Sequence, residues 1–319
     1  MNISKQTLAR LPCIYEGAYS KIYRMEHTDY GDTILKLFKK NLRAQQQLDF
    51  FKHEYEVCKD LDVKGVRKVY ECGVIENSSA LVLEYIEGHS LKEIIAQQSL
   101  SLDQSLSLAI SFTKILAEVH LQNIIHNNIN SQSILIKNNR YDNVFLIDFE
   151  LAIKEGLATE INGPLLEIYE GELSYIAPER TGRMSREVDA RSDLYSLGVV
   201  LYELFTGQLP FAAEDMSELI HSHIARQAIP VDEIAPAIPK ILSDIVLKLM
   251  AKDSNERYQS AYGLVYDLER CRQQLGKQGQ IESFTLAEQD FSDHFFLPKK
   301  LYGRETESEV LANAFKAIS

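Results

Sequence analysis

Three charged residues, far apart in the sequence, are the first candidates for chemistry: Lys36 in the run T-I-L-K, Glu54 in F-K-H-E-Y-E-V and Asp148 in D-F-E. A lysine ammonium that a fold buries needs a carboxylate partner, so a pair of Lys36 with Glu54 makes physical sense, and the resemblance described below implies it. The alternative is two solvated surface charges. Glu56 competes for Lys36, but the apolar residues on the inner face of the same helical stretch favour Glu54. Asp148 is a candidate ligand for Mg²⁺, which prefers carboxylate oxygens, or else a local cap for backbone N–H groups.

A second polar stretch runs from His126 to Ser133 and reads H-N-N-I-N-S-Q-S. Its amides can orient a hydroxyl group, but an amide has no basic lone pair at neutral pH and cannot accept a proton. His221 and His223 could suggest a metal, yet histidines two residues apart on a helix point to different faces. No further cluster of Cys or His in the sequence supports a metal site.

The elements that must position these residues change character along the chain. β-branched and aromatic runs predict strands over 22–25, 33–38, 69–74 and 80–85, with one helix over 42–61. After Gly88 the periodicity predicts helices over 102–122, 193–206, 216–226, 240–251 and 260–275, with β-like patches over 134–137 and 144–148. A strand-rich lobe followed by a larger helical lobe is the pattern of an α+β fold.

The composition is that of an ordinary globular protein. The 319 residues suggest about two domains, and the net charge of −12 disfavours binding to nucleic acid or anionic lipid by charge alone. Four dispersed cysteines predict thiols in a reducing compartment. The N-terminus has no apolar signal region, and the longest apolar-rich run, 195–205, is far shorter than the ~20 residues of a membrane helix. We therefore expect a cytoplasmic chain without membrane insertion or a nucleic-acid partner.

Many short motifs, taken in order, resemble the landmarks of protein serine/threonine kinases. They are Ile22 with Tyr23, Lys36, Glu54, Glu84 with Tyr85, His126, Asp148 with Phe149, the run Ala177, Pro178 and Glu179, then Asp193 with Ser196 to Gly198, and Arg257. The resemblance covers about residues 11–275, and so many motifs in order imply the bilobal kinase fold. It implies a small β-rich N-lobe over 8–86 and a larger helical C-lobe over 87–276.

The resemblance also implies a site for ATP and Mg²⁺. Lys36 would bind phosphate groups, Glu54 would steady Lys36, and Asp148 would hold Mg²⁺ with Ser133 as a weak second ligand. The other nucleotide-binding residues that it implies are Gly17, Ile22, Glu84, Ile86 and Leu135, with Leu83 as gatekeeper and Ile34 in place of a small alanine above the adenine.

The phosphate loop, I-Y-E-G-A-Y-S-K-I-Y, departs from the family pattern. Of its three glycines only Gly17 remains, and Tyr15 and Ser20 stand at the other two positions. Glycine there permits positive φ and a close approach of backbone N–H groups to phosphate, so we expect a stiffer hairpin and a poorer cradle. Read alone, the stretch is equally an ordinary β-turn.

The catalytic loop departs further, because the family runs H-R-D-L-K-P-E-N. By resemblance, Asn128 stands at the catalytic base, Asn130 at the phosphate-contacting lysine, Ser133 at the second metal ligand and Asn127 at the arginine that binds a phosphorylated activation loop. Glu150 and Glu172 replace a glycine and a threonine and add negative charge near the phosphates. Electrostatics supplies most of phosphoryl-transfer catalysis, and these changes oppose it.

The scaffold motifs are intact by contrast. Glu179 resembles the glutamate that pairs with a late arginine, here Arg257, and Asp193 is expected to cap the N-terminus of the central helix. Intact scaffold residues beside an altered catalytic loop predict a pseudokinase that regulates or scaffolds other modules and binds ATP weakly. The alternative is an active serine/threonine kinase with an unusual catalytic loop, since a loose transition state asks little of the base. Binding of other proteins without nucleotide is a third possibility.

The end of the chain differs from the rest. Residues 276–280 (GKQGQ) form a polar break, and 301–305 (LYGRE) with 311–315 resemble the opening of an AAA-type ATPase module. The run R-T-G-R-M over 180–184 resembles kinase domains that open large bacterial signalling proteins, in which sensor and histidine-kinase domains often follow. We therefore expect 277–319 to be a linker and the start of a further domain. The expected partners are ATP, the chain's own downstream domains and other signalling proteins.

Overall fold

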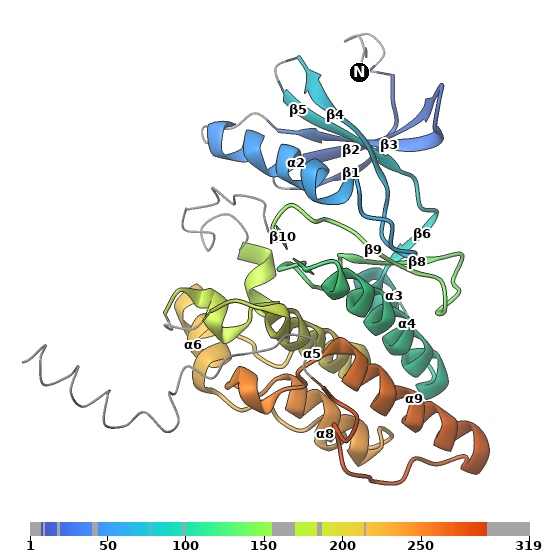
Figure 1. Ribbon diagram of the computed structural model, residues 1–319, viewed down its shortest axis with the longest axis vertical. Helices are drawn as coiled ribbons and strands as arrows, with labels where there is room; N and C mark the ends of the chain where they lie inside the picture. The colour runs from blue at the N-terminus through green and yellow to red at the C-terminus, as the bar shows by residue number, and fades with distance from the viewer. Residues whose placement is uncertain are drawn as a thin grey trace, which may run out of the picture.

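The computed structural model describes residues 8, 10–17, 20–39, 44–76, 78–97, 100–154, 170–183, 187–213 and 215–291. A smaller, strand-rich lobe lies at the top of Figure 1 and a larger, mainly helical lobe lies below it. This is the two-lobed α+β architecture that the sequence predicts.

The upper lobe is one antiparallel sheet with a helix against it. Its strands are β1 (Cys13–Glu16), β2 (Ser20–His27), β3 (Gly31–Phe38), β4 (Val69–Ile75) and β5 (Ser78–Glu84), in the order β1-β2-β3-β5-β4. Helix α2 (Ala44–Cys58) packs on β4 and β5. Side chains alternate across the sheet, so Ile34, Leu81 and Leu83 pack with Phe51 of α2 on one face. Lys36 shares the parity of Ile34 and is therefore carried on β3 toward α2.

The lower lobe is built around helix α5 (Ala190–Thr206), which is buried along most of its length. Around it lie α4 (Leu102–Leu121), α6 (Met216–Ala225), α7 (Val231–Ile234), α8 (Lys240–Leu249) and α9 (Ala261–Gln278), with the short helices η2 (Glu170–Tyr175), η3 (Pro178–Thr181) and η4 (Ser254–Glu256). Figure 1 shows α4 and α9 side by side, and these two helices pack along each other. None of the helices in the described part of the chain is long and apolar enough to cross a membrane.

Short strands join the two lobes. Strand β6 (Gly88–Ser90) pairs with β8 (Ile134–Lys137), which pairs with β9 (Val144–Leu146), and α3 (Leu91–Gln97) follows β6. Strands β7 (Ile124–Ile125) and β10 (Ile153–Lys154) form a separate pair. Gly88 permits the close approach of β6 to β8, because a Cβ atom there would lie 2.2 Å from the carbonyl oxygen of Ile136.

The start of α5 differs from the prediction. The helix begins at Ala190, and its N-cap is Asp189, whose side chain accepts a hydrogen bond from the backbone N–H of Arg191. The prediction of Asp193 as the cap was wrong, because apolar periodicity begins one turn later than the helix itself. Asp193 is a fully helical residue with a different role, described below.

The end of α9 also differs. The helix continues through Gly276 to Gln278, and Gly279 ends it in the left-handed conformation with φ of 72°. Residues 281–290, which we call the return segment, then pack on the lower lobe through Ile281, Phe284 and Leu286. The carboxylate of Asp290 accepts hydrogen bonds from the backbone of Gln259 and Ser260 and from the Ser260 hydroxyl, at the N-terminus of α9. The stretches at 301–305 and 311–315 lie outside the described residues.

Candidate nucleotide-binding and catalytic site

The ammonium group of Lys36 is the centre of the site. Its Nζ donates hydrogen bonds to Glu54 Oε2 at 3.0 Å, Asp148 Oδ1 at 3.0 Å and Glu150 Oε2 at 2.8 Å. The predicted pairing of Lys36 with Glu54 is therefore present, and Glu56 instead contacts Lys59 on the surface. The contact with Glu150 was not predicted.

The charges of this cluster shift one another's protonation. Burial lowers the pKa of Lys36, but the carboxylates of Asp148, Glu150 and Glu54 outweigh burial and hold that pKa well above its ordinary value. Burial also raises the pKa of Asp148, which Lys36 and Arg67 more than reverse, so it lies below its ordinary value. Burial raises the pKa of Glu150 to about 7 despite the attraction of Lys36. Glu150 is thus a weaker acid than Asp148.

The elements that carry these residues are fixed by buried contacts. Glu54 lies on α2, and its neighbour His53 donates from Nε2 to the carbonyl of Ala152 at 2.6 Å, which anchors α2 to the chain that follows Asp148. Phe149 is buried with its ring centroid 4.5 Å from that of His126. Asp148 has φ of 66°, an uncommon conformation for a non-glycine residue, and this turn places Asp148 and Glu150 on the same side of the chain, toward Lys36.

Arg67 is a further member of the site that sequence reasoning missed. Its Nη2 lies 3.9 Å from Asp148 Oδ1, and the side chain is buried. Arg67 precedes β4 and belongs to none of the motifs above, so only its place in the fold reveals the contact. His53 lies in the run around Glu54, but its bond to Ala152 joins segments far apart in the sequence, which that run alone does not predict.

The amide side chain of Asn130 bonds to the catalytic loop itself. Asn130 donates from Nδ2 to the carbonyl of Asn128 at 3.0 Å, and its Oδ1 accepts from the backbone N–H groups of Gln132 and Ser133. The Ser133 hydroxyl accepts from the Asn130 N–H at 3.0 Å and donates to the Asn130 carbonyl at 2.9 Å. Asn128, Asn130 and Ser133 are all buried. Asn130 therefore closes a turn, which short polar side chains do readily.

The carboxylate of Asp193 binds the backbone at the start of this loop. It accepts hydrogen bonds from the backbone N–H groups of His126 at 2.8 Å and Asn127 at 2.7 Å, and His120 Nε2 lies 2.9 Å away. Burial raises the pKa of Asp193, but the hydrogen bond with His120 and these neighbours hold it below its ordinary value. Asn127 adopts φ of 66°, which asparagine tolerates. Asp193 on α5 thus positions the catalytic loop.

The residues expected around a nucleotide come from both lobes. Ile22 lies opposite Lys36 in the β2–β3 register, and Ile34 lies opposite Leu83 in the β3–β5 register. Glu84 ends β5 and donates its N–H to the carbonyl of Lys68. Ile86, two residues after Glu84, is buried. Leu135 lies on β8 and is half-buried. That these residues bind a nucleotide stays a prediction.

The phosphate loop is described only up to Gly17 and again from Ser20. Gly17 donates its N–H to the Ser20 carbonyl at 3.0 Å, and a Cβ atom on it would lie 3.0 Å from the Tyr15 ring. That N–H group is thus used within the hairpin. The backbone of Glu172 lies in η2, and its side chain lies outside the described part.

A divalent cation fits one part of this site. The acidic groups of Glu54, Asp148 and Glu150 come within 4.8 Å of one another, but Lys36 already bonds to all three. Asp148 keeps its second carboxylate oxygen free of contacts from the described residues, so Asp148 would hold Mg²⁺. Ser133 fits less well, because its hydroxyl already makes two hydrogen bonds to Asn130. When bound, Mg²⁺ would neutralise part of the phosphate charge.

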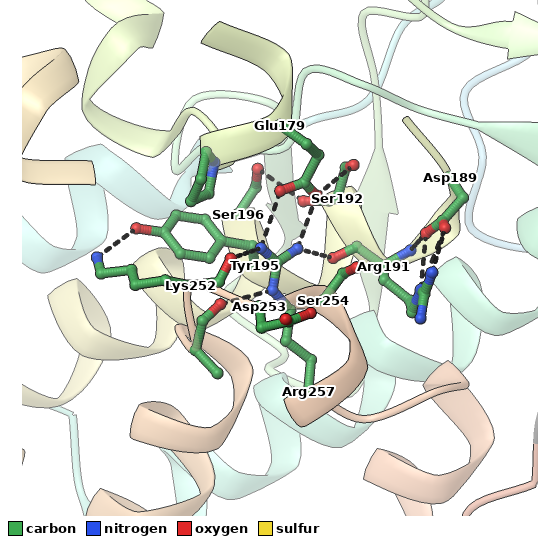
Figure 2. Close-up of polar contacts among 12 residues, drawn as sticks. Glu179, Asp189, Arg191, Ser192, Tyr195, Ser196, Lys252, Asp253, Ser254 and Arg257 are labelled. Atoms are coloured by element: carbon green, nitrogen blue, oxygen red, sulfur yellow. Dashed lines mark hydrogen bonds and ion pairs between the residues drawn. The ribbon is translucent and has the colours of Figure 1, made fainter. Parts of the chain in front are cut away.

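A buried ion pair holds the helices beneath the site, and Figure 2 shows it. Arg257 donates from Nη1 to Glu179 Oε1 at 2.7 Å and from Nη2 to Glu179 Oε2 at 2.9 Å, as predicted. Ser192 donates to the same carboxylate, and Arg257 also donates to the carbonyls of Arg191 and Ala251. Burial raises the pKa of Glu179, but Arg257 and Ser192 hold it below its ordinary value.

Comparison with known proteins decides the family. A sequence model of the protein kinase domain matches residues 10–265, most of the chain. The chain belongs to the protein kinase family. It is 31% identical over 265 residues to a probable serine/threonine-protein kinase of Clostridium perfringens, covering 82% of this chain and 38% of that protein.

Two further relatives extend this picture. The chain is 29% identical over 222 residues to serine/threonine-protein kinase PrkC of Bacillus subtilis, covering 68% of this chain and 33% of that protein. It is 41% identical over 165 residues to hybrid signal transduction histidine kinase G of Dictyostelium discoideum, covering 46% of this chain and 5% of that protein. The chain spans well under half the length of each of these three relatives.

Proposed function

We propose that this kinase domain is a pseudokinase, which binds ATP weakly with Mg²⁺ and transfers little or no phosphate. The observation that supports this most is the catalytic loop, where Asn128 replaces the base and Asn130 bonds back to the loop. An amide cannot take the proton of a substrate hydroxyl, and the positive charge of the family's lysine is missing. Its role would be regulation or scaffolding of other modules.

A second candidate function is an active serine/threonine kinase. The bond between Lys36 and Glu54 and the position of Asp148 favour it, as do the names of the bacterial relatives. A loose transition state needs little from a base, so Asn128 alone does not abolish transfer.

Labelled ATP distinguishes the two candidates. Purified protein with Mg²⁺ or Mn²⁺ is expected to label neither itself nor generic protein substrates above a Lys36→Ala control. Because Lys36→Ala leaves three carboxylates without their cation, Asp148→Asn serves as a second control. Labelling of the wild-type protein that both variants lose would establish the active kinase.

ATP binding has its own test, a thermal-shift titration with and without Mg²⁺. We expect a dissociation constant from tens of micromolar to millimolar. ATP at about 100 times that constant would add about 2.7 kcal/mol to the free energy of unfolding, a shift of several degrees. No shift at several millimolar ATP would place the domain among kinase folds that bind other proteins without nucleotide.

The wider context is also part of the proposal. The match to a hybrid histidine kinase supports the view that the domain belongs to a larger signalling protein. We place the N-lobe at 8–86, the C-lobe at 87–276 and the link to a following AAA-type module within 277–319. The partners would be that module and other signalling proteins, in the cytoplasm.

A further inference from the structure

We propose that Glu150 sets the ligand specificity of the nucleotide site, by making it favour an adenine nucleoside over its phosphorylated forms. This inference rests on the proposed binding of nucleotide between Ile22, Ile34 and Leu135. It concerns a residue whose side chain lies beside the phosphate-binding lysine and not beside the expected adenine position.

All three N–H groups of the Lys36 ammonium are already in use. A lysine ammonium has three N–H groups, and Glu54, Asp148 and Glu150 accept one each. A phosphate oxygen can therefore bind Lys36 only by displacing a carboxylate. A second cation, Arg67, is buried, and its Nη2 atom lies 3.9 Å from Asp148 Oδ1. Lys36 therefore offers a phosphate no unoccupied N–H group.

Of the three carboxylates on Lys36, Glu150 is the one that a phosphate group would displace. Glu54 is buried on α2, and Asp148 is held by Arg67 as well as by Lys36. Glu150 contacts Lys36 alone among the described residues, and at 2.8 Å this is the shortest of the three contacts. Glu150 thus occupies the donor that a phosphate would need.

The negative charge around Lys36 also opposes a phosphorylated ligand. Three acidic groups surround one ammonium, and the phosphates of ATP add further negative charge beside them. The backbone N–H of Gly17 offers no compensation, because it already donates to Ser20. An uncharged nucleoside meets none of this opposition, since the adenine side of the site is apolar: Ile22, Ile34 and Leu83 belong to one cluster.

The test compares the affinities of adenosine and MgATP for the full chain by calorimetric titration. For the wild-type protein we expect adenosine to bind at least about threefold more tightly than MgATP, equivalent to about 0.6 kcal/mol or more. Glu150→Ala should tighten MgATP about tenfold, equivalent to about 1.4 kcal/mol, and leave adenosine unchanged. Alanine is preferred to the family's glycine, because glycine would also free the backbone. Glu56→Gln is the matched control, which removes one negative charge from the surface of α2 and should change neither affinity.

Each outcome is decisive. Wild-type protein that binds MgATP as tightly as adenosine, or more tightly, overturns the inference, and so does a Glu150→Ala variant in which the ratio of the two dissociation constants is unchanged while both ligands bind. Failure of every variant to bind either ligand overturns the proposed nucleotide site itself. Glu150→Gln, which preserves the shape of the side chain, should give a smaller change of the same sign even where Glu150→Ala proves unstable.

Discussion

Arg257 is the largest side chain that the described fold buries completely. Such a burial requires partners, because an isolated charge in the interior is strongly unfavourable. The carboxylate of Glu179 and the carbonyls of Arg191 and Ala251 supply them. The pair has no catalytic role, but its loss should destabilise the whole lower lobe.

We expect Arg257→Ala to lower the free energy of unfolding by about 3–5 kcal/mol, because Glu179 would stay buried without a counter-charge. For a chain of this size the melting temperature should fall by roughly 6–20 °C, measured by calorimetry or circular dichroism. Arg140→Ala is the control: that arginine contacts Asp142 on the surface, and its loss should leave the melting temperature unchanged. Equal effects of the two substitutions would contradict the prediction.

The same pair predicts a dependence on pH. The pKa of Glu179 is lower in the folded protein than its ordinary value of 4.5, so its ionisation stabilises the fold above that pH. The stabilisation should be lost as pH falls from about 4.5 through the lowered pKa. The difference in stability between wild-type protein and Glu179→Gln should therefore be constant near neutral pH and shrink in acid. Urea titrations between pH 3 and 7 would measure it, and a difference that does not shrink would rule this out.

Helices α5 and α8 lie against each other at Gly198. A Cβ atom on Gly198 would lie 2.7 Å from Leu249 Cβ and 2.9 Å from Met250 Cγ. Gly198→Ala should push the helices apart and cost about 1–3 kcal/mol. Gly276→Ala is the matched control on α9, where a Cβ atom meets nothing within 4 Å, and there we expect a gain of about 0.5–1 kcal/mol. Thermal unfolding of both variants checks the opposite signs.

The sequence predicts those helices, strands and residue pairs that periodicity or the order of motifs specifies. The strands around Lys36, the helix of Glu54 and the pair of Glu179 with Arg257 were all predicted, since motif order and periodicity specify them. The start of α5 was not, because apolar periodicity does not mark the polar residues of the first turn, Asp189 included.

Contacts between distant elements were predicted least well. The bond from Glu150 to Lys36 depends on the left-handed backbone of Asp148, and a local sequence does not determine such a turn. Arg67 reaches Asp148 only because its chain segment pairs with Leu146 next to it. The inward turn of Asn130 likewise depends on the whole loop, not on its residue type.

At the scale of the whole molecule, the return segment closes the lower lobe over α9. Asp290 accepts three hydrogen bonds from Gln259 and Ser260, and Phe284 lies under the guanidinium of Arg270. We expect Asp290→Ala to cost about 1–2 kcal/mol, because the N–H groups of Gln259 and Ser260 lose their acceptor, while the cap of Ser260 on the Gly263 N–H remains. Amide hydrogen exchange at Gln259 and Ser260 should quicken in this variant and not in Glu288→Ala, which removes only a surface pair with Arg270. Unchanged exchange would show that the segment is held by its apolar contacts alone.

The return segment also determines how tension would enter the fold. A pull on residue 291 would load Asp290 first, and through it the N-terminus of α9. Once those hydrogen bonds, the bond from the Ala287 N–H to Asp267 and the apolar contacts of Ile281, Phe284 and Leu286 have broken, the ten residues 281–290 can extend to a length of at most about 35 Å before the pull reaches Gly279. Extension of the segment would therefore absorb the first displacement and leave α9 folded against α4, so that the kinase domain would be shielded from small movements at this end of the chain.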